Sequence, residues 1–326
     1  MYKYQAKGYL FEILIKRLLT KAGYDYLPPD AEPNWLEGRG GLHQIDAYGR
    51  FWFQVPFVFP IRLIAEAKWY ASGIQLHHIR DFVGVIKDIS ENYFVNTEAP
   101  DTEFQRRLAK RYNDCGTFFS MTHFTTRAQH YAYAQGVYLI TFEGSSILRP
   151  IKEELERNGV GRLVEQAGST GRSWRAIAEE IIDENIQLQS ELSGIASYVG
   201  ILDGIYPIHI LSKGKLGFED PKKPDDYSVK IDKKDIRIVS RLGERTSVVF
   251  VFRDENGIQL EFAIPYYSLQ TTYRRSIVFK KKAFSYIDVP VRVEYGERTF
   301  RRIFSLVISP EDQGIILGKL ESQGFF

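Results

Sequence analysis

Apolar residues recur every three or four positions near the start of the chain. In residues 4–22, positions such as Leu10, Ile13 and Leu18 share one side of a helical projection, and lysines and arginines occupy the other sides. Gly23 follows, and glycine is the usual residue just past the end of a helix. The pattern predicts that the chain opens with an amphipathic helix.

Strand and helix patterns then alternate. Short apolar runs predict strands, and apolar residues at helical spacing predict helices between them. The predicted strands are residues 43–48, 51–58, 61–69, 116–122 and 137–142, and the predicted helices are 74–93, 104–112 and 127–135. This alternation predicts a mixed α/β sheet flanked by helices.

The composition changes after Ser146. Residues 151–158 and 174–192 have helical spacing, and a glycine-rich stretch at 159–171 separates them. From residue 198 strands dominate, and Asn256-Gly257 predicts a hairpin turn because it tolerates positive φ angles. The predicted strands are 207–211, 227–231, 236–240, 247–253, 258–264, 276–279, 289–295 and 299–309. We therefore expect an α/β domain at 1–150, a helical connector at 151–195 and a β-rich domain at 196–326.

Composition limits the class of protein. The 326 residues are 44% hydrophobic and 14% aromatic, enough to fill two cores. A single cysteine, Cys115, excludes a disulfide framework and a cysteine-based zinc site. The N-terminal residues do not resemble a signal peptide, and no apolar run approaches the roughly twenty residues of a membrane span. We expect a soluble cytoplasmic protein with no membrane partner.

Positive charge is concentrated in the C-terminal half. Residues 196–326 contain 21 Lys and Arg against 17 Asp and Glu, a balance of +4 that leaves −2 for the rest of the chain. The basic clusters lie among aromatic residues, at 222–223, 233–234, 274–275, 280–282 and 301–302. Basic side chains neutralise phosphates and aromatic rings stack on bases, although the same pattern equally fits the solvent faces of ordinary strands.

Three residues form a pattern suited to phosphodiester chemistry. In the segment RLIAEAKWY, Glu66 and Lys68 are two positions apart, so they emerge on the same face of a strand. Asp46 lies about twenty residues earlier, a spacing that a hairpin can close. On spacing alone, the Glu-x-Lys tripeptide is also an ordinary exposed pair of opposite charges. The surrounding sequence decides between these interpretations.

The residue types match what a magnesium site needs. Mg²⁺ prefers oxygen ligands and keeps several waters, so one or two carboxylates suffice. A bound metal can activate a water and offset charge on a scissile phosphate, and a nearby lysine can assist both effects. Asp46 and Glu66 are therefore the candidate metal ligands, with Mg²⁺ or Mn²⁺ as the cofactor, and Lys68 is the candidate catalytic helper.

Four motifs in order resemble a known family. They are Gly8-Tyr9-Leu10-Phe11-Glu12, the glycine-rich approach 38–46 that ends at Asp46, Glu66-Ala67-Lys68, and the strand-to-helix passage FSMTHFTTRAQHYA at 119–132. Residues 1–145 on this basis resemble the PD-(D/E)xK nuclease superfamily, and within it the Mrr-like catalytic domain of restriction endonucleases. Mrr-like proteins often carry Gln-x-Lys where this chain has Glu66-Ala67-Lys68, and Ile45 replaces the proline of the superfamily motif.

The resemblance implies more than the spacing does. It implies a restriction-endonuclease-like mixed sheet, and it implies that Glu12 on the opening helix points toward the metal site as a fourth catalytic residue. Arg39, His43 and Gln44 approach Asp46, so they are candidate substrate contacts, although the glycine-rich loop is equally compatible with a simple turn. His77 is a weaker candidate, because a histidine at a helix start is commonly solvated.

The sequence thus predicts a metal-dependent endodeoxyribonuclease of restriction or phage-defence type, with DNA as its partner. Cleavage of two strands by one-metal sites favours a homodimer. Two alternatives stay open. One is a nuclease effector that acts on RNA or single-stranded DNA when a small molecule binds the C-terminal domain, and the other is a non-catalytic DNA-binding protein with a nuclease fold.

Overall fold

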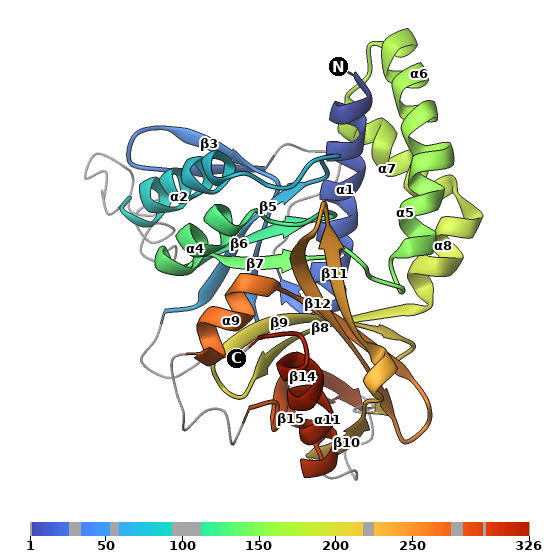
Figure 1. Cartoon of the computed structure of the whole chain (residues 1–326). Coiled ribbons are helices and arrows are strands. Elements are labelled where there is room, and N and C mark those ends of the chain that lie inside the picture. The colour runs from blue at the N-terminus through green and yellow to red at the C-terminus, as the bar shows by residue number, and fades with distance from the viewer. Residues whose placement is uncertain are drawn as a thin grey trace.

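The computed structural model describes residues 2–25, 34–52, 59–92, 112–217, 225–274, 283–295 and 298–325 (Figure 1). The described residues form a five-stranded mixed sheet, an eight-stranded sheet and a two-stranded hairpin, with helices around them. Outside the described residues lie 53–58 of the predicted strand 51–58, 104–111 of the predicted helix 104–112, the whole predicted strand 276–279 and the basic residues 222–223, 275 and 280–282. No helix in the described ranges is both long and apolar enough to cross a membrane.

The opening helix is confirmed as α1 (Tyr2–Lys21). Its apolar stripe is buried, with Leu10 and Leu18 fully inaccessible, because it lies against one face of the mixed sheet. The helix ends before Gly23, whose φ of 89° is in the left-handed region that favours glycine. A side chain at Gly23 would also collide with the Trp52 ring, so the chain turns there into the first strand.

The mixed sheet has the order β1-β4-β5-β6-β7. Its strands are β1 (Tyr24–Asp25), β4 (Ala47–Phe51), β5 (Ile61–Lys68), β6 (Asn113–Ser120) and β7 (Tyr138–Thr141). Strand β5 is antiparallel to β4 and parallel to β6, and β7 continues parallel to β6. The sheet therefore has an antiparallel part, β1-β4-β5, and a parallel part, β5-β6-β7, and β5 belongs to both.

The predicted continuous strand at 43–48 is wrong. The chain bends at Asp46, between β3 (Leu42–Ile45) and β4, because the two pieces belong to different sheets. Strand β3 pairs with β2 (Asn34–Glu37), whereas β4 pairs with β5. The alternation of side chains is therefore interrupted at Asp46, which belongs to neither the β2–β3 pairing nor the β4–β5 pairing.

Helices cover both faces of the mixed sheet, as predicted. On the face opposite α1 lie α2 (Leu76–Ser90) and α4 (Thr126–Ala134). Ile79 and Phe82 of α2 pack with Ile64 of β5 and Phe118 of β6 in one buried cluster. The mixed α/β class expected from the alternating pattern is confirmed for this part of the chain.

The segment predicted as a connector is mostly helical and packs closely on α1. It contains α5 (Arg149–Glu154), the π-helix η1 (Leu155–Gly159), α6 (Val160–Thr170), α7 (Trp174–Glu184) and α8 (Ile186–Ser193). The glycine-rich stretch at 159–171 is thus mostly helix, since Val160 and Leu163 supply a buried side. The predicted helix at 174–192 is broken at Asn185, whose side chain accepts a hydrogen bond from Leu188 N and begins α8. In Figure 1 these helices stand beside α1.

The C-terminal strands close into a barrel. They are β8 (Ile195–Leu202), β9 (Tyr206–Lys213), β10 (Asp226–Lys230), β11 (Ile236–Arg241), β12 (Glu244–Asp254), β13 (Gln259–Pro265), β14 (Tyr286–Tyr295) and β15 (Arg298–Ile308). Their order is β10-β15-β14-β8-β9-β13-β12-β11, and β10 also pairs with β12, so seven strands form a ring to which β11 is added. The predicted β-rich character is confirmed, and the predicted turn at Asn256-Gly257 joins β12 to β13.

Three C-terminal elements escape the sequence pattern. Strand β8 precedes the first predicted C-terminal strand and was not predicted. The helices α9 (Tyr266–Arg274) and α11 (Pro310–Glu321) interrupt and follow the strands. Ile316 and Leu320 of α11 are fully buried in the barrel cluster. The helix begins at Ser309, whose hydroxyl accepts from Asp312 N, and Pro310 occupies its first turn.

Buried polar side chains join the barrel to the mixed sheet. The carboxylate of Glu261 on β13 accepts from Ser146 N at 2.9 Å and from Arg237 Nη2 at 2.8 Å, and its side chain is 2% exposed. Gln129 of α4 is also buried, and its Oε1 accepts from Tyr267 N at 2.9 Å at the start of α9. Buried acceptors of this kind fix the relative position of the two parts.

Replacing Glu261 with alanine should destabilise the whole chain. The change removes a buried acceptor and leaves the Ser146 amide and Arg237 without it, which costs about 3 kcal/mol. Urea unfolding of the full chain measures this loss, with Glu255→Ala at an exposed turn position as the control. Equal unfolding midpoints for the two variants would contradict the role given to Glu261.

Candidate functional site

Asp46 is held against the end of β5. Its Oδ2 accepts from Ala67 N at 2.9 Å and from Lys68 Nζ at 3.0 Å. Both donors belong to β5, and the pair Ala47 and Ala65 in the β4–β5 ladder sets the register that brings them there. The bend between β3 and β4 therefore turns the Asp46 carboxylate onto the neighbouring strand.

Glu66 and Lys68 project from the same face of β5, as predicted. Lys68 Nζ contacts Glu66 Oε1 as well as Asp46 Oδ2, so one ammonium lies between two carboxylates. The intervening Ala67 and the preceding Ala65 point to the opposite face and are buried in the cluster around α1. The structure thus brings Asp46, Glu66 and Lys68 together at the carboxyl end of the central strand, partly open to solvent.

Burial and like charge raise the pKa of Glu66. Removal from water is the larger cause and the Asp46 carboxylate the next, and together they bring the pKa to about 7 although Lys68 opposes them. Burial alone would lower the pKa of Lys68, but Asp46 and Glu66 outweigh it and raise that pKa. The lysine is therefore charged, and Glu66 titrates near neutral pH. A second cation beside the two carboxylates would favour their ionised forms.

Glu12 lies behind this group on α1. Its side chain is almost fully buried, and its two oxygens accept from Arg175 Nε and Nη2, each at 3.1 Å. Lys16 Nζ is 3.8 Å from Glu12 Oε1. Burial raises the pKa of Glu12 to about 7 against the Arg175 hydrogen bond, and the charge of Asp46 acts in the same direction as burial. Glu12 is thus electrostatically linked to the site, while its oxygens face a guanidinium.

Arg175 is a site residue that the sequence interpretation missed. It lies on α7, in the segment predicted as a connector, and 163 positions from its partner Glu12. The sequence does contain a sign of its role. Arg175 falls on an apolar stripe with Ala178 and Ile182, and a charged residue at a buried helical position requires a partner. The amide oxygen of Gln44, oriented to satisfy its hydrogen bonds, also accepts from Arg175.

His43 and the backbone amide of Arg39 bind Asp88 rather than Asp46 or Glu66. His43 Nε2 lies 2.6 Å from Asp88 Oδ2 on α2, and the Asp88 backbone oxygen accepts from Arg39 N at 3.0 Å. Asp88 also accepts from Gly40 N, and the hydrogen bond from His43 is the main reason that the pKa of Asp88 is lowered. These contacts fasten the β2–β3 hairpin to α2, which supports the simple structural interpretation of the glycine-rich loop.

His77 is also apart from the carboxylates. It is exposed in the first turn of α2, where its ring lies 3.9 Å from that of His78. Burial, the neighbouring His77 and, more weakly, Lys68 lower the pKa of His78. His77 instead lines a separate cleft with Arg80 and Arg127.

The donor set suits a hard divalent cation with few protein ligands. Asp46 and Glu66 supply oxygens, and water and a phosphate would have to complete the coordination. In the described ranges, no three His, Cys, Asp or Glu side chains are grouped to hold a metal ion. The raised pKa of Glu66 fits a site in which a cation balances two adjacent carboxylates.

Comparisons with known proteins leave the family open. No model of a known protein family matches the chain, and no curated protein is similar in sequence. Among solved structures, the chain is similar to one titled "Crystal Structure of Protein of Unknown Function AF1548", with 16% identity, and the match covers 57% of this chain and 98% of that chain. The TM-score is 0.31, too low to relate the folds.

Replacing Glu66 with glutamine should flatten the pH dependence of stability. The folded-state pKa of about 7 is above the ordinary 4.5, so this group's contribution to the free energy of unfolding is complete below pH 4.5 and is lost as pH rises through about 7. Thermal unfolding between pH 4 and 8 without divalent metal tests this. The wild type should lose more stability over that range than Glu66→Gln, and parallel curves would contradict the raised pKa.

Proposed function

We propose that this chain is a Mg²⁺-dependent endodeoxyribonuclease. The observation that carries the proposal is the position of Lys68 Nζ, 3.0 Å from Asp46 Oδ2 and in contact with Glu66 Oε1 at the end of β5. Two carboxylates and one ammonium at a partly exposed strand end are the groups that metal-dependent phosphodiester hydrolysis requires. Asp46 and Glu66 would hold the metal, which supplies activation of water and neutralisation of phosphate charge.

Each residue has a role that follows from its contacts. Lys68 is charged and fixed by Asp46, so it offers a positioned cation to a phosphate oxygen or to the attacking water. Glu66 contacts the same ammonium and would be ionised beside a cation, so it would serve with Asp46 as a metal ligand. Glu12 is a positioning residue, because Arg175 engages its oxygens while its charge acts on Asp46 and Glu66.

The chain order supports a restriction-endonuclease-like interpretation of the mixed sheet. Helix α1 comes first, the β4–β5 hairpin carries Glu66 and Lys68, and α2 crosses over to the parallel strand β6. Because one fold serves many functions, the residues at the strand end remain the stronger support. The barrel is proposed as the part that recognises DNA or a small regulatory molecule.

Cleavage of both DNA strands would need two such sites. A homodimer that presents one site to each strand is the simplest arrangement, and it belongs to the same proposal. The RNA or single-stranded DNA effector and the non-catalytic DNA-binding protein remain the alternatives. The first predicts cleavage only with a trigger, and the second predicts binding without cleavage.

Purified protein with plasmid DNA and Mg²⁺ or Mn²⁺ tests the proposal. Asp46→Asn and Lys68→Ala should each lower the cleavage rate on the order of 10²-fold or more, because each removes a group that acts on the reacting phosphate. Glu255→Gln, at an exposed turn on the barrel, should cleave at the wild-type rate.

Cleavage that persists unchanged in both site variants would contradict the assignment. If the wild type cleaves none of duplex DNA, single-stranded DNA or RNA with either metal, the non-catalytic alternative is favoured. Parallel assays on methylated and unmethylated plasmid then define the substrate class.

A further inference from the structure

An open cleft lies beside the candidate site. It has a volume of about 750 Å³ and is lined by Gln75, Leu76, His77, Arg80, Thr125, Thr126, Arg127 and Glu244. All but Glu244 lie where α2 and α4 begin, after the parallel strands β5 and β6: Gln75 and Thr125 precede the helices, and the other five are helical. A backbone bridge between Ile74 and Phe124 fixes the two loops side by side. Ligands of open α/β sheets commonly bind at such an edge.

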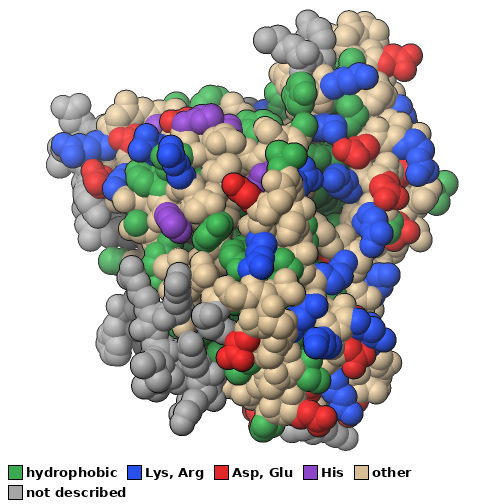
Figure 2. All heavy atoms as spheres, viewed as in Figure 1, with side chains coloured by type: hydrophobic (Ala, Val, Ile, Leu, Met, Phe, Trp, Pro, Cys, Tyr) green, Lys and Arg blue, Asp and Glu red, His purple; other side chains and the backbone are tan. Residues whose placement is uncertain are grey.

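The charge of the cleft is positive. Arg80 and Arg127 form no ion pair with any carboxylate in the ranges that the structure describes, whereas Arg62 and Arg253 are examples of arginines paired with aspartates. Arg80 lies over the ring of Tyr131 at 5.6 Å, which holds its guanidinium near the helix surface. In Figure 2, Lys, Arg and His side chains gather over α2 and α4. Two unpaired guanidinium groups on one cleft favour an anionic ligand.

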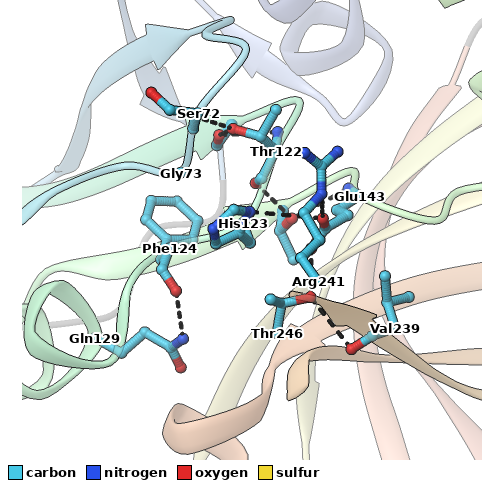
Figure 3. Close-up of polar contacts among 12 residues, drawn as sticks. Ser72, Gly73, Thr122, His123, Phe124, Gln129, Glu143, Val239, Arg241 and Thr246 are labelled. Carbon is cyan, nitrogen blue, oxygen red and sulfur yellow. Dashed lines mark hydrogen bonds and ion pairs between the residues drawn. The ribbon is translucent and has the colours of Figure 1, made fainter. Parts of the chain in front are cut away.

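The barrel supplies the opposite wall. Glu244 begins β12, directly after the turn of the β11–β12 hairpin, and it is the one carboxylate among the lining residues. Glu143 anchors this hairpin, because its carboxylate accepts from Arg241 Nε at 2.6 Å and from Thr246 Oγ1 at 2.7 Å (Figure 3). His123 Nδ1 lies 3.6 Å from the same carboxylate. The two walls of the cleft are therefore held in a fixed relation.

Part of the cleft follows the Lys68 group closely in the chain. Lys68 is the last residue of β5, and the cleft residues Gln75 to His77 follow after a short loop. Both lie toward the carboxyl ends of the parallel strands, so a polymer that runs along this edge of the sheet would pass the Lys68 group and the arginines in turn. The volume of about 750 Å³ also exceeds what a single phosphate group fills.

We propose that this cleft binds the phosphodiester backbone of the nucleic acid next to the segment that is cut. Arg80 and Arg127 would contact successive phosphates, His77 would add a hydrogen bond, and Glu244 would limit the affinity from the barrel side. The inference rests on the proposed nuclease function for its substrate class, but binding can be measured without cleavage.

Binding of fluorescently labelled nucleic acid to the full chain, without divalent metal, tests the cleft. The double variant Arg80→Ala/Arg127→Ala should weaken binding by about tenfold or more, and the slope of log affinity against log salt should become shallower by about 2. Arg162→Ala/Arg172→Ala is a matched control, since it removes the same charge from two solvent-accessible, ion-paired arginines, one on α6 and one in the turn before α7. Glu244→Gln should strengthen binding severalfold, a gain that misfolding cannot produce.

The outcomes separate the possibilities. Arms with duplex DNA, single-stranded DNA and RNA identify the polymer that carries the phosphodiesters. Equal losses in the cleft and control variants, or no gain with Glu244→Gln, would overturn the assignment of the cleft. Polyglutamate that competes as well as DNA would overturn the phosphodiester assignment. If the cleft variants change binding as expected but the wild type never cleaves nucleic acid, the proposed catalysis is refuted and the assignment of the cleft as a binding site stands.

Discussion

Strand β5 is hydrogen-bonded on both sides, antiparallel to β4 and parallel to β6, and these two ladders determine which side chains each face carries. Ala65 and Ala67 are small enough for α1 to pack closely on their face. Glu66 and Lys68 consequently emerge on the other face. A shift of β5 by one residue against its neighbours would turn Glu66 and Lys68 toward α1 and the alanines away from it. The packing of α1 and the candidate site therefore depend on the same strand register.

The charges around this strand form two linked groups. Lys68 lies between Asp46 and Glu66, and Arg175 engages the buried Glu12 from a helix far along the chain. Both Glu66 and Glu12 have a pKa raised to about 7, with burial as the main cause. Carboxylates in this condition gain from an added cation, and this gain is the physical basis for proposing a metal site at this position.

The sequence predicted the features that depend on residues close together in the chain. The 3.6-residue period gave α1, and the two-residue strand period placed Glu66 beside Lys68. The bend at Asp46 escaped prediction, because it arises from pairing of β3 and β4 with different strands. Arg175 and the closure of the barrel by β10 and β12 depend on contacts between distant segments, which periodicity does not encode. Arg39 and His43 were predicted near the metal, yet the Arg39 amide and the His43 ring bind Asp88 on α2, a contact between distant segments.

A titration with Mn²⁺ followed by electron paramagnetic resonance tests the cation site most directly, because free Mn²⁺ gives a sharp signal that is lost on binding. The wild type should bind a Mn²⁺ ion that Mg²⁺ displaces, and both Asp46→Asn and Glu66→Gln should lose it. His77→Ala should keep it, since His77 lies in the separate cleft. Binding that is unchanged in both carboxylate variants would contradict a metal site at the end of β5.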